Sequence, residues 1–136
     1  MKSREGVIRL KKFQVDEDRR QVMQIETMIN DFSSMMEVLD AQILEEQRRA
    51  GIDDVTHYAY PTYAKAAKQR RDNLEKSIED LNLQLDKAKE KLATSFEELK
   101  KLDLLEERAQ RTMEAEHADY EQSQIDEAAM QNYYRA

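Results

Sequence analysis

The chain has 136 residues, of which 38% are charged and only two are Gly and one is Pro, a composition typical of long helices or coiled coils. The net charge of −7 argues against nucleic acid and an anionic membrane surface as main partners, and the absence of Cys excludes disulfides and thiolate metal sites. The sequence shows no apolar signal core at its start and no run near the roughly 18 apolar residues of a spanning helix. We therefore expect a cytoplasmic protein without direct membrane insertion.

The first predicted helix covers about residues 4–50 and is followed by Gly51, at a position where a left-handed residue commonly caps a helix. Lys11 and Asp18 interrupt its apolar seam, which weakens packing but can fix the register of a helix pair. Methionines beside the seam indicate adaptable packing or, alternatively, a Met-rich partner surface. The seven-residue repeat consists of Ile8, Val15, Val22, Ile29, Met36, Ile43 and Ala50, and the methionines are Met23, Met28 and Met35.

Residues 51–60 are predicted to form a turn, because Pro61 suits the first turn of a following helix. The second predicted helix, about residues 61–128, has apolar residues at alternating steps of four and three. The sequence therefore predicts an all-α fold with one domain, residues 1–136, in which two long helices form an antiparallel coiled-coil hairpin and the second helix is longer and overhangs. The second repeat consists of Leu74, Ile78, Leu81, Leu85, Ala88, Leu92, Ser95, Leu99 and Leu102.

The charges suggest a register for the hairpin. We prefer the pairing in which facing residue numbers add up to 117, so that Phe32 faces Leu85 and Lys11 faces Glu106. A pairing one heptad away, with a sum of 110, would place seam charges on apolar residues at a cost in desolvation. The pairs concerned are Arg71 with Leu39 and Lys11 with Leu99.

The end of the second helix has no partner in this register. Residues 103–136 carry nine acids against three bases, and the seam positions there become Glu116 and Tyr120. We predict that residues 113–136 are frayed or depend on a partner for their structure.

No catalytic, cofactor-binding or metal-binding residue is predicted. Two Gly cannot build a glycine-rich phosphate loop. Glu114 and His117 have the E-x-x-H spacing of di-iron bundles, but such a site needs a second copy and two further Glu on facing helices. A two-helix hairpin also has no enclosed pocket that would perturb its carboxylates. We therefore expect no enzyme activity, no cofactor and no small-molecule substrate.

The turn combines aromatic residues with the bases that follow them, as protein-binding hot spots do. The alternative is a hairpin tip that seals its own end with Tyr rings. The aromatic residues are Tyr58, Tyr60 and Tyr63, and the bases are Lys65, Lys68, Arg70 and Arg71.

Residues 1–21 (MKSREGVIRLKKFQVDEDRRQ) and 57–74 (HYAYPTYAKAAKQRRDNL) resemble the flagellar export protein FliJ family, and the resemblance covers essentially the whole chain. It implies a cytoplasmic component of the bacterial flagellar type III export apparatus, peripherally associated with the inner membrane and similar to the central stalk of a rotary ATPase. Such a protein would bind the hexameric export ATPase, promote its assembly and activity, and couple it to the membrane export gate protein, in support of motility and chemotaxis. The resemblance also implies a role as chaperone or chaperone escort, with export chaperones as partners.

Two sets of side chains are candidates for these contacts. Bases at the start of the first helix would face the ATPase, and Tyr and Arg residues at the turn would face the gate. Solvated helix faces are the alternative for the basic residues of both sets, and a generic coiled-coil scaffold or homodimeric adaptor without a flagellar role is the alternative function. The ATPase-facing set is Arg4, Arg9, Lys12, Arg19 and Arg20, and the gate-facing set is Tyr58, Tyr60, Tyr63, Arg70 and Arg71.

Overall fold

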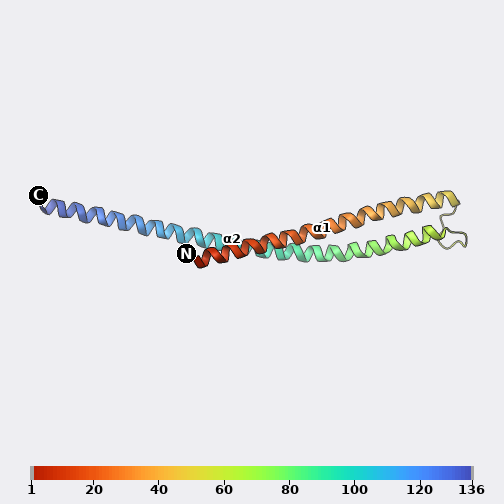
Figure 1. Cartoon of the computed structure of the whole chain (residues 1–136), viewed down its shortest axis with the longest axis horizontal. Helices are drawn as coiled ribbons and strands as arrows, with labels where there is room; N and C mark the ends of the chain where they lie inside the picture. The colour runs from red at the N-terminus through yellow and green to blue at the C-terminus, as the bar shows by residue number, and fades with distance from the viewer. Residues whose placement is uncertain (1, 136) are drawn as a thin grey trace. The chain divides into compact units, whose positions relative to one another are not determined.

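The structure is a computed structural model that describes the backbone of residues 2–135 and the side chains of residues 4–135. It contains two helices, α1 (Lys2–Ala50) and α2 (Thr62–Arg135), joined by residues 51–61 (Figure 1). The described residues include no strand. The predicted all-α fold of two long helices, with the second one longer, is therefore confirmed.

The chain falls into two compact units, which we call the loop unit and the terminal unit. The loop unit is Val15–Thr94, and the terminal unit combines Met1–Gln14 with Ser95–Ala136. Each unit contains one stretch of α1 and one stretch of α2, so each has its own seam between helices.

The loop unit packs through the apolar seam that the heptad repeat predicts. Val22 and Ile25 of α1 and Leu81 and Ala88 of α2 are buried and form its core. The two helices of this unit lie side by side and run in opposite directions from the loop (Figure 1). The removal of these apolar side chains from water supplies the main stabilising contribution. Partly buried residues that pack against the core are Ile29, Phe32, Leu85 and Leu92.

The predicted register is wrong by one heptad in the loop unit. Arg71 Nε donates to Asp40 Oδ1 at 2.9 Å, and Lys91 Nζ lies 3.6 Å from Asp18 Oδ1, so these facing numbers add up to 111 and 109. The rejected pairing places Arg71 next to Leu39, but its charge is not stranded there. A long basic side chain can lay its stem along apolar surface and carry its charge outwards, and Arg71 reaches the carboxylate beside Leu39.

Residues 51–61 form a loop that local hydrogen bonds hold in place. Gly51 has a φ of 69°, the left-handed conformation that favours Gly, and its N–H donates to the Gln47 carbonyl at 2.8 Å. Asp54 Oδ1 accepts from the hydroxyl of Thr56 at 2.7 Å and from its backbone N–H at 3.0 Å. These bonds lower the pKa of Asp54, because they favour the ionised carboxylate.

The terminal unit packs through a seam that depends more on charge. Ile8 of α1 is buried, but the seam positions on either side of it are Arg4 and Lys11. Arg4 Nη1 lies 3.4 Å from Glu106 Oε2, and Lys11 pairs with Glu98. The predicted pairing of Lys11 with Glu106 is therefore wrong, and the register of this unit also differs from the prediction by about one heptad.

The remainder of the terminal unit is a helix that α1 does not cover. Every residue from 110 to 135 is exposed, and α2 stays helical to Arg135, beyond the predicted end near residue 128. Ala136, the last residue of the predicted overhang, lies outside the described residues. That residues 113–136 depend on a partner stays a prediction.

Candidate partner-binding surfaces

Three bases of α1 are exposed and make no ion pair with any side chain that the structure describes. Arg9 and Lys12 belong to the terminal unit, and Arg19 belongs to the loop unit. An acidic partner could therefore approach each of these charges without breaking an ion pair inside its unit.

The other two bases of the predicted ATPase-facing set already have acidic neighbours. Arg4 is half-buried and pairs with Glu106 of α2, so it contributes to the seam of the terminal unit. Arg20 pairs with Glu17 one turn earlier on the same helix, and its side chain is 61% exposed. Because an exposed pair of this kind contributes little to stability, Arg20 can be recruited by a partner at a lower cost than Arg4.

Two of the five residues predicted at the turn serve the loop unit itself. Tyr60 is 8% exposed, and its hydroxyl accepts a hydrogen bond from Gln47 Nε2 at 2.9 Å. Arg71 pairs with Asp40 of α1 and with two acids of its own helix. The hydrogen bond to Asp40 raises the pKa of Arg71. Part of the turn therefore seals the hairpin tip, as the alternative interpretation of the Tyr cluster expects.

The other three residues of that set are exposed. The Tyr58 side chain is 96% exposed, and its ring stacks on His57 with the ring centroids 4.7 Å apart. Tyr63 is 53% exposed and donates its hydroxyl hydrogen to Gln42 Oε1 at 3.1 Å. Arg70 is exposed and has no ion pair among the described side chains. Among the five residues of the set, these three are exposed, whereas Tyr60 is buried and Arg71 is half-buried.

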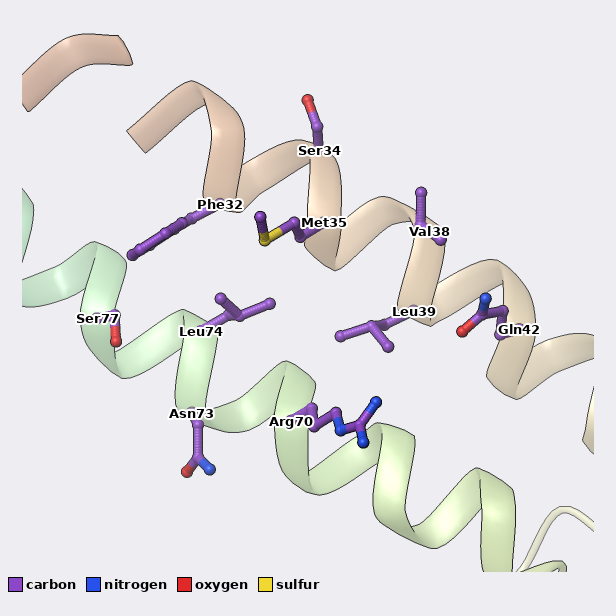
Figure 2. A pocket seen from close by; sticks show the side chains of 10 residues that line it. All are labelled: Phe32, Ser34, Met35, Val38, Leu39, Gln42, Arg70, Asn73, Leu74 and Ser77. Atoms are coloured by element: carbon purple, nitrogen blue, oxygen red, sulfur yellow. The ribbon is translucent and has the colours of Figure 1, made fainter. Parts of the chain in front are cut away.

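An open groove of about 680 Å³ lies beside Arg70 in the loop unit, between α1 and α2. Figure 2 shows Met35 and Leu39 of α1 and Leu74 of α2 directed towards the space between the helices, with Arg70 on the α2 side. The sequence placed Met35 beside the seam, but the groove also needs residues of α2 in the correct register, so sequence reasoning missed it. The other lining residues are Phe32, Ser34, Val38, Gln42, Asn73 and Ser77.

The described residues contain no group of three or more Asp, Glu, His or Cys side chains placed to hold a metal ion. Within the described residues, neither α1 nor α2 contains a stretch that is both long and apolar enough to span a membrane.

A family model described as "Flagellar FliJ protein" matches residues 2–136, which is nearly the whole chain. The chain belongs to the FliJ family. No curated protein and no solved structure matches it significantly. As a FliJ family member it is a component of the flagellar protein export machinery, in which this family provides a non-catalytic accessory protein for flagellar assembly.

Proposed function

We propose that this FliJ family member binds the hexameric flagellar export ATPase through bases of α1 and binds the membrane export gate protein through the turn end of the loop unit. In this role it promotes assembly and activity of the ATPase and couples it to the gate of the type III export apparatus. The observation that carries the proposal is exposed basic charge without an ion pair among the described side chains. The bases concerned are Arg9, Lys12 and Arg19 of α1 and Lys65, Lys68 and Arg70 of α2.

Charge supports the ATPase contact. An exposed Arg or Lys without a neighbouring acid attracts carboxylates of a partner and speeds their encounter. Arg9, Lys12 and Arg19 meet this condition, and Arg20 can join them once its exposed pair with Glu17 is exchanged. Arg4 remains with Glu106 and keeps the seam of the terminal unit closed.

Shape and chemistry support the gate contact. The groove offers apolar walls from Met35, Leu39 and Leu74, and Arg70 supplies a cation on the α2 side. Exposed Tyr and Arg side chains beside an apolar depression are the usual constituents of a binding hot spot. The gate segment that fits would therefore insert an apolar side chain and place an acidic one near Arg70.

The same groove supports a role as chaperone or chaperone escort. Met35 and Val38 are 51% and 57% exposed, and flexible Met side chains adapt to different apolar partners. Export chaperones would then share the groove with the gate. A protein that binds both an ATPase ring and a membrane gate works in the cytoplasm, peripherally associated with the inner membrane at the flagellar base.

The experiment that tests the ATPase contact is a titration of the cognate flagellar export ATPase with this protein, with ATP hydrolysis and ring assembly as readouts. We expect stimulation that saturates at far fewer than one copy per ATPase subunit, because one hairpin would serve one ring. The absence of both stimulation and complex formation by the helical protein would refute the proposal.

Two triple variants with the same change in charge separate the two contacts. Arg9→Glu with Lys12→Glu and Arg19→Glu should abolish stimulation of the ATPase and leave gate binding intact. Lys65→Glu with Lys68→Glu and Arg70→Glu should do the reverse, measured with the cytoplasmic domain of the gate protein. Far-UV circular dichroism confirms that both variants are helical. Equal effects of both triples on both partners would indicate unspecific attraction and contradict the assignment.

A homodimeric adaptor is the second candidate, and exposed apolar residues outside the seams favour it. Leu104 and Leu105 of the terminal unit are 49% and 51% exposed, and Leu83 of the loop unit is 64% exposed. Two hairpins could bury such residues in a four-helix bundle. Light scattering of the full chain decides this point, because the adaptor requires a stable dimer and a monomer would exclude it.

A further inference from the structure

The heptad seam of α2 continues beyond the part of the helix that α1 covers. Leu99, Leu102, Glu106 and Ala109 follow one another at steps of three and four, and all four are half-buried in the terminal unit. The same steps continue through residues that are all exposed. These further seam residues are Met113, Glu116, Tyr120, Ser123, Glu127, Met130 and Tyr134.

Glu106 shows how this seam accommodates an acidic residue. Its side chain is 19% exposed, and Arg4 of the facing helix lies 3.4 Å from it. The next acids at seam positions are Glu116 and Glu127, which have no ion pair with any described side chain. Both occupy seam positions like that of Glu106, which faces a cation of α1 in the covered part of the seam.

The uncovered helix also has features that favour a basic partner. Residues 110–135 carry six acids and two bases, so a second copy of the same segment would be repelled. Tyr120 and Met130 are 62% and 59% exposed at seam positions. A helix of this length gains little stability in water without a packed face. Both the charge and the apolar seam would be satisfied by a helix that is basic and amphipathic.

We propose that residues 110–135 form an intermolecular coiled coil with a basic amphipathic helix of another protein. That helix places an Arg or Lys opposite Glu116 and another opposite Glu127, and it packs apolar residues against the seam between and beyond them. This contact uses neither the bases of α1 nor the groove of the loop unit, so it does not depend on the proposed ATPase and gate contacts.

Binding of designed peptides to the full chain tests the predicted geometry. One helical peptide carries an apolar heptad seam with Arg at the two positions opposite Glu116 and Glu127, and a second peptide carries Glu there. Fluorescence anisotropy should show that the chain prefers the Arg peptide by about tenfold, the size expected for two exposed ion pairs gained or lost. Hydrogen exchange should slow in residues 110–135 with the Arg peptide.

Two double variants with the same net charge make this test specific. Glu116→Arg with Glu127→Arg should reverse the preference, so that the Glu peptide binds more tightly. Glu114→Arg with Glu121→Arg changes exposed acids outside the seam and should keep the preference for the Arg peptide. If the two double variants behave alike, or if exchange in residues 110–135 stays fast with the Arg peptide, the proposal is overturned.

Photo-cross-linking in flagellated cells tests whether such a partner exists. A photoreactive residue replaces Tyr120, at a seam position, or Ile125, outside the seam, and these side chains are 62% and 61% exposed. We expect position 120 to give a single main adduct and position 125 to give little. The adduct at position 120 should lie in a helical segment of the partner that carries two bases ten or eleven residues apart. Equal adducts at both positions, adducts only with a second copy, or adducts in a segment without those bases would overturn the proposal.

Discussion

The two units use the same heptad repeat in different ways. The loop unit fills its seam with Val22, Ile25, Leu81 and Ala88, which are all buried. The terminal unit places Arg4 and other charged residues at its seam and has few buried apolar side chains among those described. An apolar seam stabilises through burial, whereas exposed ion pairs contribute little net free energy but define which residues face each other.

This difference is consistent with the roles that we propose for the two units. A unit with an apolar core keeps its helices together and can present a groove of fixed shape. A unit with a charged seam opens at a lower cost, and every residue of its helix from 110 to 135 is exposed. We therefore expect hydrogen exchange to be slower in the core of the loop unit than in the terminal unit.

Truncation of a core residue should produce the largest effect. Leu81 is 6% exposed in the loop unit, so Leu81→Ala removes buried apolar surface and leaves a cavity. We expect a loss of about 2–3 kcal/mol in the free energy of unfolding, near the low end for Leu→Ala because a two-helix core can relax. Urea unfolding followed by circular dichroism measures it. Leu83→Ala is the control, since Leu83 is 64% exposed and should change stability by less than about 0.5 kcal/mol. Equal losses in both variants would show that the seam is not the core.

Replacement of Asp18, a buried carboxylate of the loop unit, should produce the next largest effect, with the opposite sign. Asp18 is 4% exposed, no described group donates a hydrogen bond to its Oδ2 atom, and Lys91 Nζ lies 3.6 Å from Oδ1. Asp18→Leu should therefore raise the free energy of unfolding by about 1–3 kcal/mol. Asp16→Leu, at an exposed position, should have almost no effect.

A loss of stability in Asp18→Leu would contradict this account. It would mean that the carboxylate holds the seam in register more strongly than its burial destabilises it. Light scattering on the same variant shows whether the added apolar residue changes the oligomeric state.

The sequence predicted the fold class well because the heptad repeat is a strong local signal. It predicted Lys11 and Asp18 as the interruptions of the first seam, and both lie between the helices in the structure. The predicted register is wrong because it assumes a fixed charge at Arg71 on the seam, whereas the Arg71 side chain extends to Asp40 beside Leu39. Register depends on the reach of long side chains, and a pattern of residue types does not contain that information.

The candidate sites were predicted only in part for a related reason. Exposed tyrosines and tyrosines that seal a tip have the same sequence signature, and the structure separates Tyr58 from the buried Tyr60. Arg70 and Arg71 are adjacent in sequence, yet Arg70 is exposed beside the groove and Arg71 pairs with Asp40. Which of two adjacent residues remains without an ion pair depends on the residues of the facing helix, and hence on the register.

The ion pair between Arg4 and Glu106 in the terminal unit should contribute less to stability than the apolar core of the loop unit. Glu106→Arg places two cations together and should destabilise this unit by about 1 kcal/mol, since the partners are 35% and 19% exposed and solvent screens them. The double variant Arg4→Glu with Glu106→Arg should recover most of the loss. Hydrogen exchange in residues 2–14 and 95–109 measures the effect, and Glu97→Arg is an exposed control. Failure of the double variant to recover would show that the two residues do not face each other.

The smallest expected effect concerns the end of α1 in the loop unit. Arg48 Nη2 donates a hydrogen bond to Glu45 Oε1 at 2.8 Å. This contact lowers the pKa of Glu45, and Arg49 adds to the effect. Because the folded pKa is lowered, this pair stabilises the folded state above the ordinary glutamate pKa, and the contribution is lost as pH falls through the lowered value. Arg48→Gln should return the pKa of Glu45 towards its ordinary value in an NMR titration, and Arg49→Gln should shift it less. A larger shift in Arg49→Gln would show that Arg49, and not Arg48, makes the dominant contact with Glu45. If neither variant changes the pKa of Glu45, these exposed ion pairs do not persist in solution, in contrast to the core contacts of the same unit.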